Sequence, residues 1–333
     1  MNQLVSNPSN TPESYFQTRS FAQVIEDGSN EPLRRKIGGA FLYENTTHYF
    51  FSRTNYGKSF LAFQLGFAAA TGTSIARCTA LQNECEPMKV VVVDLEMDSK
   101  TIYDRHKLAV QNTDPELLKN LVFLHEKLDQ KIVIGFEMLE KIEQAAIGNK
   151  AKLIIIDNKS KLLPDSLKPD LVTMVISSLN RIREKTGAAI LVIGHTTKGD
   201  VRTAISPTSY YGSAMLQNFF TEMFFLDVTK DGRFFLCHAK TKREECYTQN
   251  VPVFTRGFHP ACGIGFTFEQ LLPIADVQLP LTILPSASST KRNLAKYREE
   301  IALLIKAGIR PAKIAEMCGV HRSSISRLLE ESP

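Results

Sequence analysis

One short segment, residues 52–59, constrains the possible folds of this chain more than any other. It reads Ser-Arg-Thr-Asn-Tyr-Gly-Lys-Ser, between an apolar aromatic run at residues 49–51 and an apolar, helix-forming run at residues 60–70. A Gly-Lys-Ser turn between a strand and a helix is the context of a phosphate-binding loop. We expect its backbone N–H groups to hold phosphates, Lys58 to reach the β- and γ-phosphates, and Ser59 to bind Mg²⁺.

The loop departs from the usual G-x-x-x-x-G-K-[ST] pattern at its first position, where Ser52 replaces glycine. Because a strand residue at that position does not need a positive φ, we expect nucleotide binding to survive, with slow turnover. Tyr56, bulky for its position, is expected to pack over the loop or the ribose. The expected nucleotide-binding residues are Ser52, Asn55, Gly57, Lys58, Ser59 and Phe60.

Two further apolar runs end in carboxylates, at residues 89–94 and 152–157. Continuous β-branched runs are typical of parallel strands buried on both faces, and ligands bind beyond the carboxyl ends of such strands. We expect Glu96 to orient or deprotonate the water that attacks the γ-phosphate, and Asp157 to hold Mg²⁺ through water. A helix-capping role is the alternative for this acidic stretch, and it suits Asp98 better than Glu96.

A fourth apolar strand, at residues 188–193, runs into Gly-His-Thr-Thr-Lys. His195 at this strand end is expected to hydrogen-bond the γ-phosphate, the alternative being an ordinary polar loop histidine. The run at residues 171–185 is amphipathic at helical spacing, and residues 36–43 are expected to add a small strand. Strands alternating with helices predict an α/β fold with a mainly parallel central sheet flanked by helices.

Four segments carry a family resemblance: Gly-Lys-Ser at 57–59, Asp-Leu-Glu-Met at 94–97, Ile-Ile-Ile-Asp-Asn at 154–158 and Ile-Gly-His-Thr-Thr-Lys-Gly-Asp at 193–200. Together they resemble the RecA/DnaB-type ATPase core, and more closely the RepA-like hexameric helicase ATPases (AAA family) of plasmids and mobile elements. The likeness covers roughly residues 30 to 270 and continues at 211–218, similar to a G-S-x-x-L segment. It implies ATP and Mg²⁺ as cofactors, a homo-oligomer such as a hexamer, and a channel loop for single-stranded DNA at residues 198–208.

The resemblance also implies cations that act on the neighbouring subunit's nucleotide. In these relatives a strand followed by K-x-[RK] supplies them, and the matching positions here are Lys240 and Lys242, with Arg243 beside them. A cation there would stabilise the negative charge of the phosphoryl-transfer transition state. Lysine lacks the planar bidentate contact of arginine, so a weaker contribution is expected. A solvated basic hairpin is the alternative.

Positive charge concentrates at the end of the chain. Residues 290–333 hold nine Lys and Arg against five Glu, which accounts for most of the net charge of +5. This concentration indicates a polyanion-binding module, the alternative being a solvated basic helix.

The pattern of residues 307–329 resembles a helix-turn-helix of the resolvase or transposase type, with apolar packing positions at Ile314, Val320 and Ile325. The resemblance implies that one helix faces the major groove of duplex DNA. A three-helix interaction module is the alternative. The expected DNA-binding residues are His321, Arg322, Ser323, Ser324 and Arg327.

The expected organisation is a flexible tail over residues 1–30, which could include a short helix from Phe21 to Ile25, and a RecA-like ATPase domain over 31–271. A linker over 272–290 and a helix-turn-helix domain over 291–333 follow. No apolar run approaches the ~20 residues of a membrane span, so a cytoplasmic protein without membrane contact is expected. The six cysteines form no C-x-x-C pair, which suggests neither a zinc site nor a disulfide framework.

These features predict an ATP-binding and ATP-hydrolysing protein that acts on DNA as a helicase-like motor in plasmid or mobile-element replication. The alternative is a nucleotide-switched, site-specific DNA-binding regulator with slow ATPase activity, which the irregular loop and the terminal helices favour. A third function left open is a partner-recruiting ATPase that loads another enzyme.

Overall fold

The computed structural model describes residues 18–75, 78–94, 97–125, 136–158, 162, 169–196, 205, 214–259, 263–277, 294–306, 310–318 and 320–330. Glu96, most of the expected channel loop at 198–208 and most of the expected linker lie outside these residues. Residues 1–34 and residues 35–333 form two compact units, which are described separately.

The first unit contains one helix, α1 (Phe21–Asn30), among its described residues. A capping box starts it: the Ser20 hydroxyl accepts from the N–H of Gln23, and the Gln23 side chain accepts from the N–H of Ser20. The helix extends beyond the Phe21 to Ile25 segment expected from the sequence. None of its residues is buried, and Phe21, Val24 and Ile25 are exposed.

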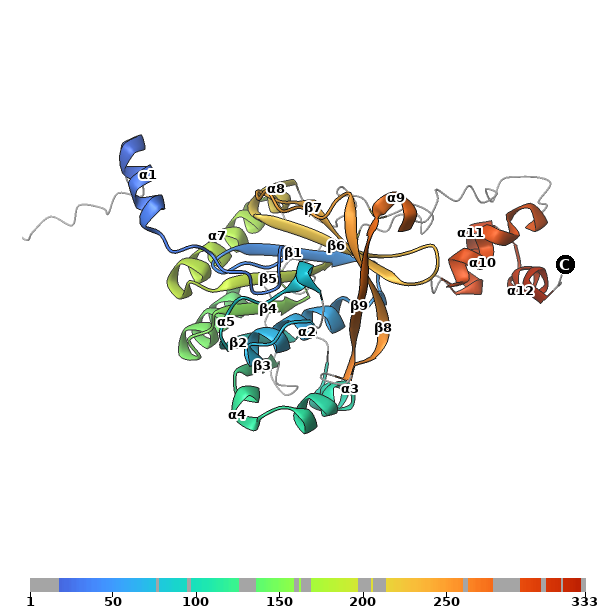
Figure 1. Cartoon of the computed structure of the whole chain (residues 1–333), viewed down its shortest axis with the longest axis horizontal. Helices are drawn as coiled ribbons and strands as arrows, with labels where there is room; N and C mark the ends of the chain where they lie inside the picture. Colours follow the sequence, from blue (N-terminus) through green and yellow to red (C-terminus); the bar gives the residue numbers. More distant parts are fainter. Residues whose placement is uncertain are drawn as a thin grey trace, which may run out of the picture. The chain divides into compact units, whose positions relative to one another are not determined.

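The second unit is built on one sheet, shown in Figure 1, with the strand order β3-β2-β4-β5-β1-β6-β7-β8-β9. The strands from β3 to β6 in this order pair in parallel, and β6 to β9 pair antiparallel. The strands are β1 (Thr47–Ser52), β2 (Val90–Asp94), β3 (Leu121–His125), β4 (Leu153–Asp157), β5 (Ala189–His195), β6 (Glu222–Val228), β7 (Phe234–Lys240), β8 (Asn250–His259) and β9 (Gly263–Pro273).

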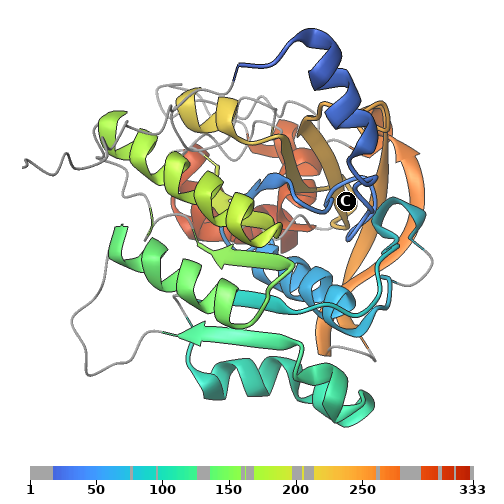
Figure 2. The same cartoon turned by 90° about the vertical axis from the view of Figure 1, so that its left-hand side faces the viewer.

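Helices cover both faces of this sheet (Figure 2). Apolar residues of α5 (Phe136–Gly148) and α7 (Pro169–Thr186) form one core with the strands. Residues of α2 (Lys58–Thr71) form a second core with the other faces of the same strands. Because β2, β4 and β5 are buried on both sides, their sequences are continuously apolar. The expected α/β fold with a mainly parallel sheet is confirmed.

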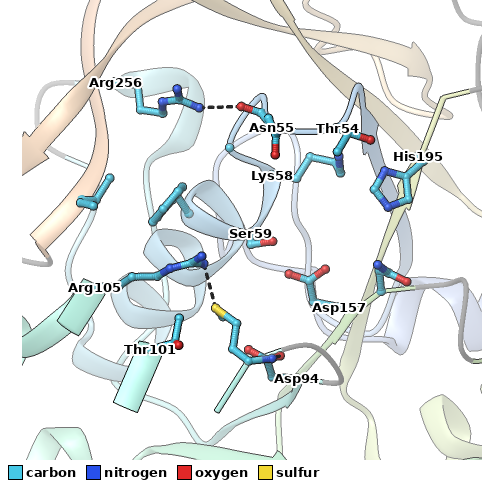
Figure 3. A pocket seen from close by; sticks show the side chains of 15 residues that line it. Thr54, Asn55, Lys58, Ser59, Asp94, Thr101, Arg105, Asp157, His195 and Arg256 are labelled. Carbon is cyan, nitrogen blue, oxygen red and sulfur yellow. Dashed lines mark hydrogen bonds between the residues drawn. The ribbon is translucent and has the colours of Figure 1, made fainter. Parts of the chain in front are cut away.

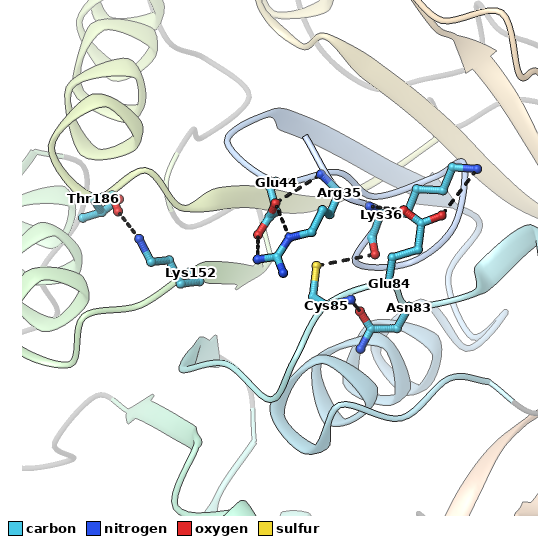
Figure 4. Close-up of polar contacts among 8 residues, drawn as sticks. All are labelled: Arg35, Lys36, Glu44, Asn83, Glu84, Cys85, Lys152 and Thr186. Carbon is cyan, nitrogen blue, oxygen red and sulfur yellow. Dashed lines mark hydrogen bonds and ion pairs between the residues drawn. The ribbon is translucent and has the colours of Figure 1, made fainter. Parts of the chain in front are cut away.

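The segment at residues 35–44 is a tight turn, and the small strand expected at 36–43 is wrong. Only isolated bridges form, Lys36 with Tyr43 and Gly38 with Ala40. Gly39 reverses the chain at a φ of 57°. This left-handed conformation is not extended, so it interrupts any strand there. The turn is closed by an ion pair between Arg35 and Glu44, with Nη2 2.8 Å from Oε1 (Figure 4).

A long hairpin of β8 and β9 completes the sheet, and it contacts both α2 and α3 (Ser99–Asn112). The side chain of Gln64, in α2, fixes the hairpin by two hydrogen bonds to the backbone of Phe266, each 2.8 Å long. Near the start of β9, a Cβ on Gly263 would lie only 2.2 Å from the carbonyl oxygen of Arg105 in α3. This hairpin was not predicted from the sequence.

Short helices connect these elements, and three helices lie near the end of the chain. The connecting helices are α4 (Pro115–Leu118), α8 (Ala214–Phe219) and α9 (Ile274–Val277), with 3-10 turns at Thr79–Leu81 and Leu294–Tyr297. The last three are α10 (Arg298–Lys306), α11 (Pro311–Cys318) and α12 (Arg322–Glu330). These three share a hydrophobic cluster of their own, which includes Ile301, Ile314 and Ile325. Their assignment as a helix-turn-helix remains a prediction.

Candidate nucleotide-binding site

Ser52, the residue in place of the first loop glycine, is the last residue of β1. It is fully buried and lies opposite His195 in β5, and its hydroxyl donates to the carbonyl of Arg53 at 3.0 Å. The loop's left-handed positions are instead Asn55, at a φ of 69°, and Gly57, at 94°. The first position of this loop therefore belongs to a strand, where glycine is not required.

Gly57 is the residue of the loop where a side chain has no room. A Cβ there would lie 2.9 Å from Cζ of Phe266 and 3.1 Å from Cδ of Arg256. Gly57 also precedes α2, so the first N–H groups of this helix begin at Lys58. An N-terminus with unsatisfied N–H groups favours an anion.

A cavity of about 590 Å³ lies beside this helix start (Figure 3). Side chains from the carboxyl ends of β2, β4 and β5 face it, which is the edge where ligands bind in parallel sheets. It is lined by Thr54, Asn55, Gly57, Lys58, Ser59, Phe60, Asp94, Met97, Thr101, Arg105, Asp157, Asn158, His195, Arg256 and Ile264.

Seven residues expected from the sequence lie together in this cavity: Asn55, Gly57, Lys58, Ser59, Phe60, Asp157 and His195. Lys58 is buried, and its ammonium donates to the carbonyls of Ser52 at 3.2 Å and Arg53 at 2.9 Å. Tyr56, expected to pack over the loop or the ribose, instead packs its ring on Val228 and edge-on against Phe234.

Asp94 also lines the cavity, although no role was predicted for it from the sequence. It ends β2 directly opposite Asp157 in β4, so two carboxylates meet at neighbouring strand ends. The sequence signal existed, because both acids close apolar runs. Carboxylate and hydroxyl oxygens are ligands that Mg²⁺ prefers. With Ser59 they fit a Mg²⁺ ion that keeps several waters and phosphate oxygens as its other ligands.

Two arginines also line the cavity, Arg105 from α3 and Arg256 from β8. Neither arginine was predicted from the sequence to lie at this site. Each is far from the loop in sequence, and neither belongs to a motif. Only the path of α3 and of the hairpin over the start of α2 brings them to the site.

A buried ion pair joins the loop to β6. The Arg53 guanidinium lies 3.0 Å from the Asp227 carboxylate, whose side chain is 2% exposed. The second Asp227 oxygen accepts from the backbone N–H of Ile205 at 2.9 Å. Burial raises the pKa of Asp227, and Arg53 opposes this shift.

The three cations expected to act on a neighbouring subunit do not line the cavity. The Lys240 ammonium donates to the carbonyls of Gln217 at 2.8 Å and Phe220 at 2.7 Å. The Arg243 guanidinium lies 3.6 Å from the centre of the Tyr43 ring. Lys242 is exposed.

Four of the expected DNA-binding residues lie within α12, three of them in its first turn. Arg322 and Arg327 are exposed, and Ser323 and Ser324 are partly buried. His321 precedes the helix, with its Nδ1 2.9 Å from the Ser323 hydroxyl.

Comparison with known proteins identifies the family. Residues 11–201, more than half of the chain, match an AAA domain family. The chain belongs to this AAA domain family. With its phosphate-binding loop and mainly parallel sheet, the AAA domain makes the chain a nucleotide-binding ATPase, and the family's ATP and Mg²⁺ suit the cavity.

No curated protein sequence matches this AAA domain protein. Among solved structures, it is similar to the crystal structure of the KaiC-like protein PH0186 from the hyperthermophilic archaeon Pyrococcus horikoshii OT3, with 17% identity and a TM-score of 0.47. The match covers 71% of this chain and 99% of that one. No described helix of the AAA domain protein is both long and apolar enough to cross a membrane.

Proposed function

We propose that this AAA domain protein is a homo-oligomeric ATPase that acts on DNA as a helicase-like motor in plasmid or mobile-element replication. One observation carries the proposal: Lys58, Ser59, Asp157 and His195 line a single cavity at the start of α2. Lys58 binds the β- and γ-phosphates, and Ser59 and Asp157 hold Mg²⁺, which neutralises charge on the phosphates. Asp94 adds a second carboxylate on the metal side.

His195 and Glu96 serve the γ-phosphate in this proposal. Glu96 follows β2 by two residues and orients the attacking water. His195 hydrogen-bonds the γ-phosphate from the end of β5. The next residue, Thr196, donates its N–H to the Ser52 carbonyl at 3.2 Å, which ties the end of β5 to the start of the loop. Loss of the γ-phosphate on hydrolysis can thus alter the position of the residues that follow β5, where single-stranded DNA is expected to bind.

Lys242 is the best placed of the three cations to act on a neighbouring subunit, because it is exposed. Lys240 would first have to release its hydrogen bonds to the carbonyls of Gln217 and Phe220. Arg243 would have to leave the ring of Tyr43. We therefore assign the main trans-acting role to Lys242, with Lys240 and Arg243 in support.

Duplex DNA binds to the last three helices in this proposal. Support comes from the exposed Arg322 and Arg327 of α12 and from the excess of positive charge after residue 290. Arg322, Arg327 and His321 contact base edges or phosphates, and the two serines contact neighbouring edges.

The test is ATP hydrolysis measured with and without single-stranded and double-stranded DNA. The wild type is expected to hydrolyse ATP faster with single-stranded DNA and to unwind a forked duplex, and Lys58→Ala abolishes both. A mixture of Lys58→Ala and Lys242→Ala subunits should recover part of the activity. Where the two variants are neighbours, one site combines the intact Lys58 of one subunit with the intact Lys242 of the other. A protein that stays monomeric with ATP and DNA would overturn the motor.

A nucleotide-switched DNA-binding regulator is the second candidate, favoured by the separate hydrophobic cluster of the last three helices. It predicts sequence-selective duplex binding that depends on ATP, without strand displacement. Arg322→Ala should then weaken the footprint on a preferred duplex. An unchanged footprint would reject α12 as the recognition helix.

A further inference from the structure

The β8–β9 hairpin forms one wall of the nucleotide cavity within the same chain. Arg256 and Ile264 face the cavity from its two strands. The two hydrogen bonds from Gln64 attach the hairpin to the helix that follows the phosphate-binding loop. The Phe266 ring lies 2.9 Å from the Cβ position of Gly57, so the hairpin touches the loop itself.

Arg256 extends from this wall to the loop. Its Nη1 donates to the Asn55 carbonyl at 2.9 Å, and its guanidinium carbon lies 5.0 Å from the centre of the Phe234 ring. Among the described residues, these contacts hold the guanidinium while using one of its five N–H groups. Partial burial lowers the pKa of Arg256, and no carboxylate among the described residues offsets that shift.

Arg105 lies across the same end of the cavity, on α3. Its guanidinium carbon is 5.0 Å from the centre of the Phe60 ring, and its Nη1 is 2.8 Å from the sulfur of Met97. As with Arg256, no carboxylate in the described part of the chain forms an ion pair with it. Arg105 and Arg256 therefore line one cavity with no acidic partner among the described residues, an arrangement that favours an anion.

Figure 3 shows how the two arginines lie relative to the other charged groups. Arg105 and Arg256 are to the left of Lys58 and Ser59, whereas His195 is to the right of Lys58 and Asp157 is below it. Under the proposed function, Asp157 and His195 mark the end that receives the γ-phosphate and Mg²⁺. The arginine end then receives the nucleoside and its nearest phosphate, and the apolar Phe60 and Ile264 there suit a base.

We propose that Arg105 and Arg256 bind the nucleoside and α-phosphate end of a nucleoside di- or triphosphate from within the same chain. This inference rests on the proposed function. Each chain therefore binds a nucleotide by itself, and assembly with a neighbour is needed for hydrolysis alone.

The test measures ADP and ATP binding by isothermal titration calorimetry, with Mg²⁺, for the wild type, Arg105→Gln and Arg256→Gln. Each variant loses one charge-assisted contact, so affinity should fall roughly ten- to hundredfold. Since the arginines lie away from the γ-phosphate end, ADP and ATP should weaken by the same factor. Arg34→Gln, an exposed arginine outside this unit, is the matched control and should bind like the wild type.

Thermal melting without nucleotide checks that each variant is folded. Arg256→Lys is the second variant at that position, because it keeps the charge and the aliphatic stem, and its affinity should fall between those of the wild type and Arg256→Gln. If wild-type binding matches that of Lys58→Ala, the proposed function itself fails. If Lys58→Ala binds weakly but both glutamine variants bind like the wild type, only the present inference fails.

Two other results would also overturn it. A loss of ATP affinity without loss of ADP affinity would place the arginines at the γ-phosphate. Restored ATP binding in a mixture of Lys58→Ala and Arg256→Gln subunits would show that Arg256 serves a neighbouring site. If Arg256 acts within its own chain, no restoration is expected. Every subunit in the mixture then lacks either Lys58 or Arg256 at its own site.

Discussion

At the scale of single residues, Gly57 is the position where the loop tolerates least change. Its φ of 94° disfavours any side chain, and a Cβ would lie too close to the Phe266 ring and tightly against Arg256. Gly57→Ala should therefore shift the loop and weaken ATP binding at least tenfold, at a cost of about 1–3 kcal/mol of folding free energy. Calorimetry and urea unfolding measure the two effects.

Gly28→Ala is the matched control for that substitution. Gly28 lies inside α1, and no atom lies within 4 Å of its Cβ position. Alanine is favoured there by about 1 kcal/mol of helix propensity. Nucleotide binding should not change. Equal loss of binding in both variants would contradict the special geometry of Gly57.

At Ser52, in contrast to Gly57, the glycine of the usual loop pattern should bring no gain in activity. Because it is a buried strand residue, Ser52→Gly should not speed ATP hydrolysis, although it restores the usual loop pattern. Glycine in a strand instead costs about 0.5–1 kcal/mol. Steady-state ATPase assays and urea unfolding check this. A severalfold faster turnover in Ser52→Gly would show that the serine limits the enzyme.

At the scale of elements, the attachment of the hairpin to α2 depends on Gln64. Gln64→Leu keeps the volume but leaves the N–H and carbonyl of Phe266 without their partner. Each unsatisfied buried group costs about 1–3 kcal/mol, so the loss of both partners should lower the free energy of unfolding by about 2–6 kcal/mol. Urea unfolding measures the loss.

A second readout separates this effect from general destabilisation. Amide hydrogen exchange in β8 and β9 should accelerate in Gln64→Leu more than exchange in β4 or β5. Gln270→Leu, at an exposed position of β9, is the control and should change neither. Uniform acceleration across the sheet would contradict a local role for Gln64.

The elements also show what the sequence could and could not predict. Buried parallel strands such as β2 and β4 are continuously apolar and end in acids. The positions of these strands, and the edge of the sheet at which their acids lie, therefore follow from local sequence. Arg105, Arg256 and Asp227 could not be predicted as neighbours of the loop. Their positions depend on pairings between segments far apart in the chain, which no local pattern encodes. Glu96 and the DNA-contacting residues stay predictions.

At the scale of the whole molecule, two buried histidines make stability depend on pH. Burial lowers the pKa of His48 to about 3 and that of His238 to about 4. His48 accepts from the N–H of Tyr43, and His238 accepts from the N–H of Tyr247, so both are neutral when folded. The unfolded chain binds more protons below pH ~6.5, and stability falls as the pH falls.

The expected loss is about 1.4 kcal/mol per pH unit for each histidine below pH ~6.5, or about 4 kcal/mol for both between pH 7 and pH 5. For His238 the loss levels off near its folded pKa of about 4. Urea unfolding at the two pH values measures it. His238→Gln should show about half the loss, and His125→Gln, at an exposed position, the full loss. An unchanged pH dependence in His238→Gln would contradict the assignment.

The hairpin wall lies late in the sequence, so it is also synthesised late. Residues that line the cavity run from Thr54 to Ile264, whereas the match to the AAA domain family ends at residue 201. A nascent chain thus carries a complete phosphate-binding loop long before it carries the strands that close the pocket. We therefore expect nucleotide binding to become possible only late in synthesis, and a fragment cut at residue 201 would lack that wall.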